Sequence, residues 1–208
     1  MKTEIIIIED RESINRANAI LHAGGLVVFP TDTVYGIAAS ARKSHAILKL
    51  YQVKRRPHDL PIPVLIATQK QLMQVAILVP EYAQRLMEKF WPGPITFVLH
   101  RDPTLPAELG PGKTIGIRMP DHAFVLRLIN EVGPLAVTSA NLSGDMSPTT
   151  AIEVLQQLDG SFELLIDGGQ TTGQVPSTVV DCTGNKPFIL RKGPISEDQI
   201  NIYLAAQP

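Results

Sequence analysis

Cysteine is almost missing from this sequence, since Cys182 is the only one among 208 residues. A single cysteine excludes a disulfide framework within the chain, and it argues against a zinc site built from several thiolates. A lone thiol also fits a reducing compartment.

Long apolar runs are missing as well. The run Ile5–Ile8 holds only four residues before Glu9 and Asp10, which is too short for a signal peptide or a membrane span. No other apolar stretch approaches the length needed to cross a bilayer. We therefore expect a cytoplasmic protein without a membrane partner, and we interpret residues 5–8 as a first strand.

A strong net charge is lacking too. The formal net charge at pH 7 is −1, so the chain as a whole has no electrostatic attraction to nucleic acid or to anionic lipid. The charges are unevenly placed, however. Between residues 42 and 56 there is no Asp or Glu, and there are six cations: Arg42, Lys43, Lys49, Lys54, Arg55 and Arg56. This segment is either a solvated helix face or a local anion site, and the charge pattern favours neither.

Several well-known catalytic motifs are absent. The sequence contains no Gly-x-Ser-x-Gly, no His-Glu-x-x-His and no Gly-x-Gly-x-x-Gly, and its five histidines show no metal-ligand spacing. The segment Gly110–Thr114 resembles the end of a phosphate-binding P-loop. Ala107 stands where that motif requires its first glycine, and a strand-like segment follows instead of a helix. Hydrolase, zinc-enzyme and dinucleotide-oxidoreductase functions all lose support.

Short apolar runs alternate with amphipathic segments, which predicts a mixed α/β domain. The last strands follow one another without long helices, so part of the sheet is expected to be antiparallel. Ser44, Asp121 and Thr150 are candidate helix caps, and Glu153 completes a capping box with Thr150. The predicted strands are residues 5–8, 26–29, 63–66, 95–100, 114–118, 135–138, 164–167, 178–181 and 188–191. The predicted helices begin near Glu12, Ser44, Thr68, Glu81, Asp121, Thr150 and Ser196.

The cations before Pro57 have two interpretations. Positive side chains at the C-terminus of a helix interact favourably with its dipole, which is a purely structural role. If residues 54–56 instead leave the helix as an extended segment, Lys54 and Arg56 point to one side and Arg55 to the other. Pro57 favours the extended form. Two cations on one side of a stiff loop suit a polyphosphate.

Other polar groups follow predicted strands. Residues 29–36 end a buried strand with two hydroxyls, a carboxylate and a phenol, and residues 138–144 follow another with hydroxyl and amide groups. Each segment forms either a capped turn or a polar rim for a ligand. Arg118 alternates with core residues beside Gly116, so it is either a carboxylate or phosphate clamp or an arginine paired on a solvated sheet face.

Taken together, these segments resemble the YrdC-like family of threonylcarbamoyl-adenylate synthases. No single segment is decisive, but the matches run in order along nearly the whole chain. They are Pro30–Gly36, the Lys54/Arg56 pair, Trp91–Thr96, Ile117–Pro120, the Ser139/Asn141 pair, Ser147–Thr150, Ser177–Asp181 and Leu190–Gly193.

The resemblance implies a twisted mixed parallel and antiparallel sheet flanked by helices, with a concave electropositive cleft. We expect a single YrdC-like domain over residues 1–208, like the family's short form without an extra C-terminal domain. Leu60 and Leu65 depart from the Asn and His of the longer members. The residues implied to contact ATP are Lys54, Arg56, Thr114, Ser139, Asn141, Ser147 and Arg191. Those implied to hold threonine are Thr33, Arg118 and Ser177.

The implied reaction joins L-threonine, bicarbonate and ATP into threonylcarbamoyl-AMP and pyrophosphate for the threonylcarbamoyladenosine modification of tRNA. Lys54 and Arg56 would be the catalytic cations, Mg²⁺ would arrive on the ATP phosphates, and the product would pass to a tRNA threonylcarbamoyl transferase. Two alternatives remain open at this point. One is a non-catalytic YrdC-like protein that contacts RNA through the cleft. The other is the carbamoyl-adenylate chemistry of hydrogenase maturation proteins, whose zinc-finger cysteines this sequence lacks.

Overall fold

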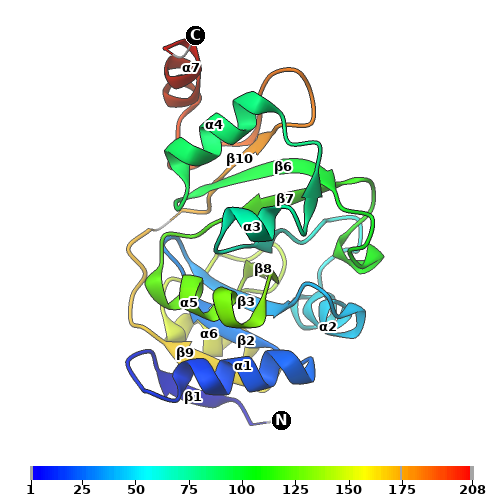
Figure 1. Ribbon diagram of the computed structural model, residues 1–208. Coiled ribbons are helices and arrows are strands. Elements are labelled where there is room, and N and C mark those ends of the chain that lie inside the picture. Colours follow the sequence, from blue (N-terminus) through cyan, green and yellow to red (C-terminus); the bar gives the residue numbers. More distant parts are fainter. Residues whose placement is uncertain (1, 174, 207–208) are drawn as a thin grey trace.

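The computed structural model describes residues 2–173 and 175–206, and within them the strands form one mixed sheet with helices on both faces (Figure 1). The strands are β1 (Glu4–Ile7), β2 (Val27–Pro30), β3 (Tyr35–Ser40), β4 (Val64–Leu65), β5 (Ala76–Ile77), β6 (Ile95–Arg101), β7 (Thr114–Arg118), β8 (Leu135–Ser139), β9 (Leu164–Asp167), β10 (Thr178–Asp181) and β11 (Phe188–Arg191). The helices are α1 (Ser13–Ala23), α2 (Ser44–Lys54), α3 (Gln69–Leu72), α4 (Glu81–Phe90), α5 (Ala123–Val132), α6 (Ala151–Leu158) and α7 (Glu197–Ala205), with a 3-10 turn at Ala107–Leu109.

The sheet order confirms the predicted mixed α/β fold. It runs β1-β9-β2-β3-β8-β4-β7-β6-β10-β11, and β5 pairs with β6 outside this path. The pairs β1–β9, β9–β2, β4–β7 and β6–β10 are parallel. The pairs β2–β3, β3–β8, β8–β4, β6–β7 and β10–β11 are antiparallel. The last pair is the antiparallel part that the closely spaced C-terminal strands predict.

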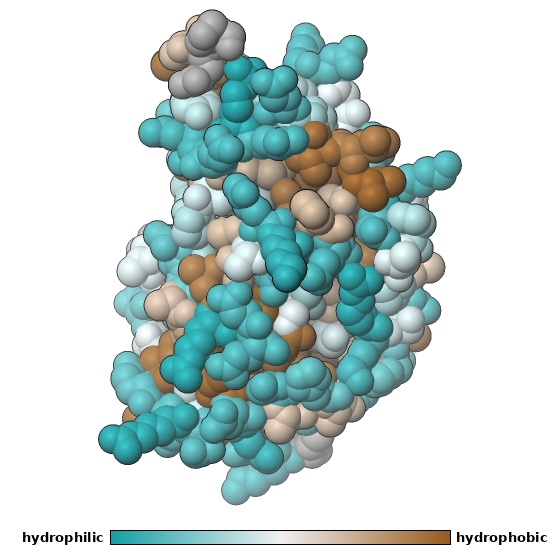
Figure 2. Space-filling view, viewed as in Figure 1, coloured by the Kyte–Doolittle hydropathy of each residue, from teal (hydrophilic) through white to brown (hydrophobic). Residues whose placement is uncertain are grey.

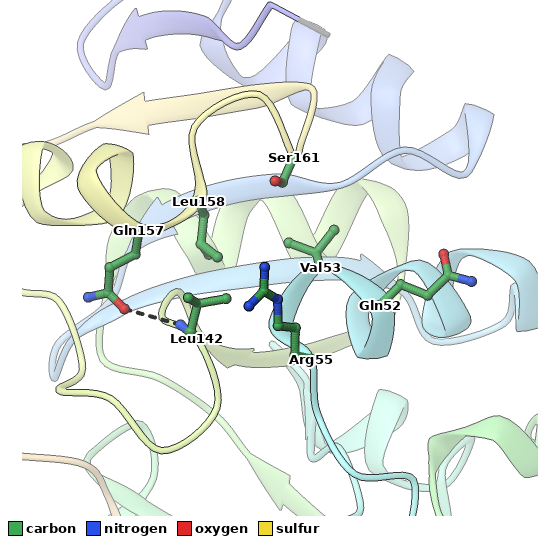
Figure 3. A pocket seen from close by; sticks show the side chains of 7 residues that line it. All are labelled: Gln52, Val53, Arg55, Leu142, Gln157, Leu158 and Ser161. Atoms are coloured by element: carbon green, nitrogen blue, oxygen red, sulfur yellow. Dashed lines mark hydrogen bonds between the residues drawn. The ribbon is translucent and has the colours of Figure 1, made fainter.

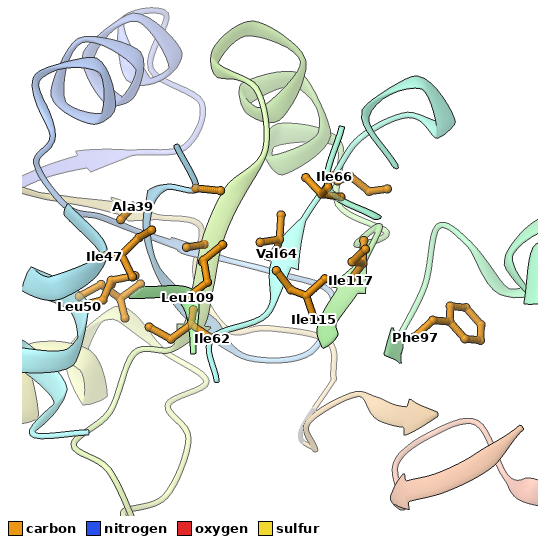
Figure 4. Close-up of a cluster of buried hydrophobic side chains, with 14 of the residues drawn as sticks. Ala39, Ile47, Leu50, Ile62, Val64, Ile66, Phe97, Leu109, Ile115 and Ile117 are labelled. Atoms are coloured by element: carbon orange, nitrogen blue, oxygen red, sulfur yellow. The ribbon is translucent and has the colours of Figure 1, made fainter. Parts of the chain in front are cut away.

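Alternating side chains divide the core into two clusters on opposite faces of the sheet. In β2, Val27 and Phe29 pack with α1 and α5, while Val28 belongs to the larger cluster on the other face. That larger cluster also holds Ile115 and Ile117 of β7 (Figure 4). Because both faces of the central strands are covered, these strands are continuous apolar runs instead of alternating ones.

Strand register shows which residues of β6 and β7 lie on the same face of the sheet as the α1/α5 cluster. Leu65 of the α1/α5 cluster lies beside Arg118 of β7, and Gly116 of β7 lies beside Val98 of β6. Directly paired residues share a face of the sheet. Arg118, Gly116 and Val98 therefore lie on the α1/α5 face, where they line a cleft instead of packing beneath a helix.

Most predicted elements are confirmed to within one or two residues, but two strands escaped prediction. Residues 35–40 form β3, although Tyr35 and Gly36 belong to the segment that the sequence assigns to a capped turn or a polar rim, and Ala76–Ile77 form β5. The small side chains of Gly36, Ala38 and Ala39 carry little strand signal, and β3 exists because β2 and β8 pair with both of its edges.

The predicted helix caps fared differently. Thr150 forms the expected capping box with Glu153. Ser44 does not cap α2, because it is the first helical residue and Lys43 holds the cap position. Asp121 does not cap α5, because His122 holds the cap position there.

Within the described ranges, no helix combines the length and the apolar character needed to span a bilayer. Hydrophilic side chains cover much of the face shown in Figure 2, with apolar groups between them.

The central core gives a direct test of the packing. Phe97 is fully buried, and its ring meets that of Trp91 edge to face at a centroid distance of 5.3 Å. We expect Phe97→Ala to lower the free energy of unfolding by about 3–5 kcal/mol, because a large cavity remains. Phe188→Ala on the exposed edge strand is the matched control, with an expected change below about 1 kcal/mol. Equal losses in urea denaturation of the two variants would contradict this packing.

Candidate active site

A cleft of about 370 Å³ lies on the α1/α5 face of the sheet, over strands that α1 and α5 do not cover. It draws side chains from the loop after β2, the loop after α2 and strands β6, β7, β8, β10 and β11. Seven of the ten predicted site residues line it: Thr33, Arg56, Arg118, Ser139, Ser147, Ser177 and Arg191. Residues that are far apart in the sequence therefore meet in one place.

Arg118 is held by three acceptors and is almost fully buried. Its Nε donates to the Gly93 carbonyl at 3.0 Å, its Nη1 to Thr33 Oγ1 at 3.0 Å and its Nη2 to Asp32 Oδ1 at 2.5 Å. A guanidinium has five N–H groups, so one N–H on each terminal nitrogen is left over. Arg118 is paired, as one interpretation expected, but the pair lies in the wall of a cleft and not on a solvated face.

Ser177 is fixed from two sides. Arg191 donates to the Ser177 carbonyl from Nε at 3.0 Å and from Nη2 at 2.9 Å, and the Ser177 hydroxyl lies 2.8 Å from that of Thr96. Burial and the nearby charge of Arg118 lower the pKa of Arg191. Burial is the larger cause, and the smaller contribution of Arg118 is a repulsion between two cations that an anionic ligand relieves.

Arg56 lines the cleft from the loop after α2. Its Nε donates to the Leu60 carbonyl at 3.1 Å and its Nη2 to the Pro61 carbonyl at 3.0 Å. Burial lowers its pKa. Pro57 and Pro61 restrict this loop, so the guanidinium is held in a stiff segment, as the proline spacing predicts.

Lys54 does not lie where the sequence places it. It is the last residue of α2 instead of part of an extended segment, its side chain is 1% exposed, and it does not line the cleft. Its Nζ donates to the carbonyls of Ser139 and Asn141, both at 2.5 Å. Lys54 thus fixes the turn after β8. Burial, and to a smaller extent the positive charge of Arg56, lowers the pKa of Lys54 to about 7.

Two further predicted contacts lie outside the lining. Asn141 is buried beside Lys54, and its Nδ2 donates to the carbonyls of Leu142 and Asp145. It therefore stabilises the turn that presents Ser139. Thr114 is exposed at the start of β7, two residues before Gly116, so it shares the cleft face at the outer end of the strand.

Arg55 is separated from Arg56, as expected, but for a different reason. It is the cap of α2 in the left-handed conformation, with φ of 49° and ψ of 40°. It lines a second hollow of about 410 Å³ together with Gln157 and Ser161 (Figure 3). The predicted extended backbone at residues 54–56 is therefore wrong, while the division between Arg55 and Arg56 holds.

Three lining residues belong to segments noted in the sequence but were not among the predicted ligand contacts. Thr31 accepts from the Thr33 amide at 3.1 Å and so shapes the turn after β2, and Thr96 binds Ser177. Tyr35 donates through its hydroxyl to the Gly169 carbonyl at 2.7 Å, which ties the loop after β9 to the cleft. Alternation along residues 95–99 could have placed Thr96 on the face opposite Ile95 and Phe97. The role of Tyr35 depends on a contact across 134 residues.

Metal ligands do not gather in the part of the chain that the structure describes, since it holds no group of three or more His, Cys, Asp or Glu side chains placed to bind one ion. The anion-binding groups of the cleft are the arginines and hydroxyls described above.

Comparison with known proteins gives consistent matches. The family model Sua5_yciO_yrdC, described as telomere recombination, matches residues 19–193. A threonylcarbamoyl-AMP synthase of Bacillus subtilis is 45% identical over 197 residues, which cover 92% of this chain and 56% of that protein. One of Pyrococcus abyssi is 41% identical over 202 residues, with coverage of 94% and 59%.

The fold of a solved relative agrees as well. The crystal structure of P. abyssi Sua5 complexed with L-threonine superposes with a TM-score of 0.93 at 39% identity, covering 97% of this chain and 61% of that one. The chain thus spans less than two thirds of the length of these relatives.

The buried Lys54 makes stability depend on pH. Folding lowers its pKa from the ordinary value of 10.5 to about 7, so between these pH values the unfolded chain binds more protons than the folded one. As the pH rises from 7 to 10, the free energy of unfolding of the wild type should therefore increase by about 1–3 kcal/mol relative to that of Lys54→Met. Chemical denaturation of both proteins at several pH values measures this gain. A difference that stays flat, or that shrinks with rising pH, would contradict it.

Proposed function

Since this chain belongs to the Sua5/YciO/YrdC family, we propose that it forms threonylcarbamoyl-AMP and pyrophosphate from L-threonine, bicarbonate and ATP. The observation that carries the proposal is the single cleft that unites both predicted half-sites. Thr33, Arg118 and Ser177 provide the amino-acid side. Arg56, Ser139, Ser147 and Arg191 provide the nucleotide side.

Arg118 suits the threonine carboxylate. Its charge is fixed by three acceptors before any ligand arrives, and it keeps one N–H on each terminal nitrogen. Two parallel N–H groups of an arginine match the two oxygens of a carboxylate. Thr33 and Ser177 also line the cleft, and their hydroxyls can bind further polar groups of the amino acid.

The proposed reaction has two steps that balance. The threonine amine and bicarbonate give an N-carboxylate with loss of water. An oxygen of that carboxylate then attacks the α-phosphorus of ATP, the bond from phosphorus to the bridging oxygen breaks, and pyrophosphate leaves. Negative charge spreads over phosphoryl oxygens in the transition state, so fixed cations and donors are the principal catalytic need.

Arg56 and Arg191 both line the cleft and meet this need from different segments, since Arg56 follows α2 and Arg191 ends β11. Lys54 acts from a greater distance. It holds the turn that carries Ser139, and its charge lies beneath the nucleotide side. The proposed chemistry therefore relies on positioning and electrostatic stabilisation instead of a protein nucleophile.

We propose that Mg²⁺ would arrive on the ATP phosphates, and that the arginines and hydroxyls of the cleft would bind phosphate oxygens beside it. The ion would neutralise phosphate charge. The labile product would pass to a tRNA threonylcarbamoyl transferase, and a cytoplasmic location would suit these partners. The relatives' names favour this synthase over a non-catalytic RNA-binding protein.

Adjacent arginines allow a matched test. Arg56→Ala removes a cation from the cleft and should lower kcat/KM for pyrophosphate release by about 10–100-fold, as expected for the loss of a charged hydrogen bond. Arg55→Ala removes the same charge one residue away, from the separate hollow, and should stay within about threefold of the wild type.

The assay supplies ATP, Mg²⁺, threonine and bicarbonate, and each is omitted in turn. No pyrophosphate release by the wild type in the complete mixture would refute the proposed function. Equal losses in the two arginine variants would refute the assignment of Arg56. Salt-sensitive RNA binding without ATP turnover would favour the RNA-binding alternative.

A further inference from the structure

Asp32 stands behind the cleft wall and carries an unusual pairing. Its Oδ1 accepts from Arg118 Nη2, while its Oδ2 is buried and has no hydrogen-bond partner among the described residues. The side chains of Arg118 and Asp32 are only 9% and 11% exposed. A buried carboxylate oxygen without a donor is costly, and such groups call for an explanation.

A second unpartnered atom belongs to a residue on which the charge of Asp32 acts. His122 caps α5 three residues after Met119, and its Nδ1 is also buried without a partner in the described part of the chain. The charges of Asp32 and of Asp121 both act on its ring, although burial is the larger influence and lowers the pKa of His122. A neutral imidazole can carry its proton on Nδ1 and donate it.

The loop that holds Asp32 is itself confined. Thr31 bonds to the Thr33 amide and to the Val34 carbonyl, and Thr33 Oγ1 accepts from Arg118. From the other side, the backbone of Gly173 packs so closely that an added Cβ would lie 2.5 Å from the Asp32 carbonyl oxygen. Asp32 therefore has little freedom to follow a moving arginine.

We propose that Asp32 and His122 are positioning residues for the amino-acid carboxylate. Asp32 orients the guanidinium of Arg118, and the Nδ1–H of His122 supplies, through one water, the donor that Asp32 Oδ2 lacks. This inference rests on the proposed function, because it makes Arg118 the carboxylate site. Neither residue lines the cleft, so both act through Arg118.

The consequence is selective for one substrate. An arginine that is already fixed loses little freedom when the carboxylate binds, which favours binding of the amino acid. The residues proposed to contact ATP are Arg56, Ser139, Ser147 and Arg191, and in the described structure none of them bonds to the Asp32 carboxylate. Weakening this support should therefore change affinity for threonine without changing affinity for ATP.

Calorimetric titration of threonine and of ATP, each alone, tests the proposal. Asp32→Asn keeps the size of the side chain and removes its charge, and we expect the Kd for threonine to rise about tenfold or more while the Kd for ATP stays within twofold. Asp121→Asn removes an exposed carboxylate from the same neighbourhood and is the matched control, with both Kd values unchanged.

The histidine gives an independent arm. His122→Ala should weaken threonine binding severalfold, and His122→Asn should restore it, because the Asn amide nitrogen can occupy the position of Nδ1 and donate. If Asp32→Asn does not fold, this pair of variants decides the question. Unchanged threonine affinity in Asp32→Asn and in His122→Ala would overturn the proposal, as would a parallel loss of ATP affinity.

Failure of the proposed function is separable from failure of this inference. A wild type that binds threonine but releases no pyrophosphate refutes the synthase, while the comparison of threonine affinities still decides the role of Asp32. A wild type that binds no threonine overturns both.

Discussion

The contact between Arg118 and the loop after β2 is the interaction on which the cleft depends. Strands β2 and β7 are separated in the sheet by β3, β8 and β4, yet Arg118 reaches Asp32 and Thr33 across the open face. A charged side chain can be buried there only because Asp32 neutralises it and three acceptors satisfy it. The same contact defines one wall of the cleft and leaves two N–H groups for a ligand.

Lys54 makes a corresponding tie on the nucleotide side. It joins the end of α2 to the turn after β8 through the carbonyls of Ser139 and Asn141, and that turn carries Ser139 into the cleft. Arg118 and Lys54 are therefore structural as well as electrostatic. Arg56 and Arg191 hold backbone carbonyls too, but their side chains line the cleft and face its space.

Much of this arrangement can be read from the sequence, and the failures have physical causes. The alternation along residues 115–119 placed Arg118 opposite the core correctly, because a strand fixes the direction of its side chains. The same reasoning failed for Lys54, since the helix continues through it and Arg55 takes the left-handed conformation that ends it. Local patterns do not reveal which carbonyls a lysine will find. Asp32, Thr96 and Tyr35 were missed as supporting residues because each acts through a partner distant in the sequence.

The central claim is that one cleft holds the amino acid on a preset arginine and the nucleotide phosphates on Arg56 and Arg191. A crystal structure of this chain with L-threonine and a non-hydrolysable ATP analogue tests it most directly. The account predicts the threonine carboxylate on Nη1 and Nη2 of Arg118, with the Arg118–Asp32 pair intact and the phosphates beside Arg56 and Arg191. A carboxylate bound away from Arg118, or phosphates beside Arg55, would contradict it.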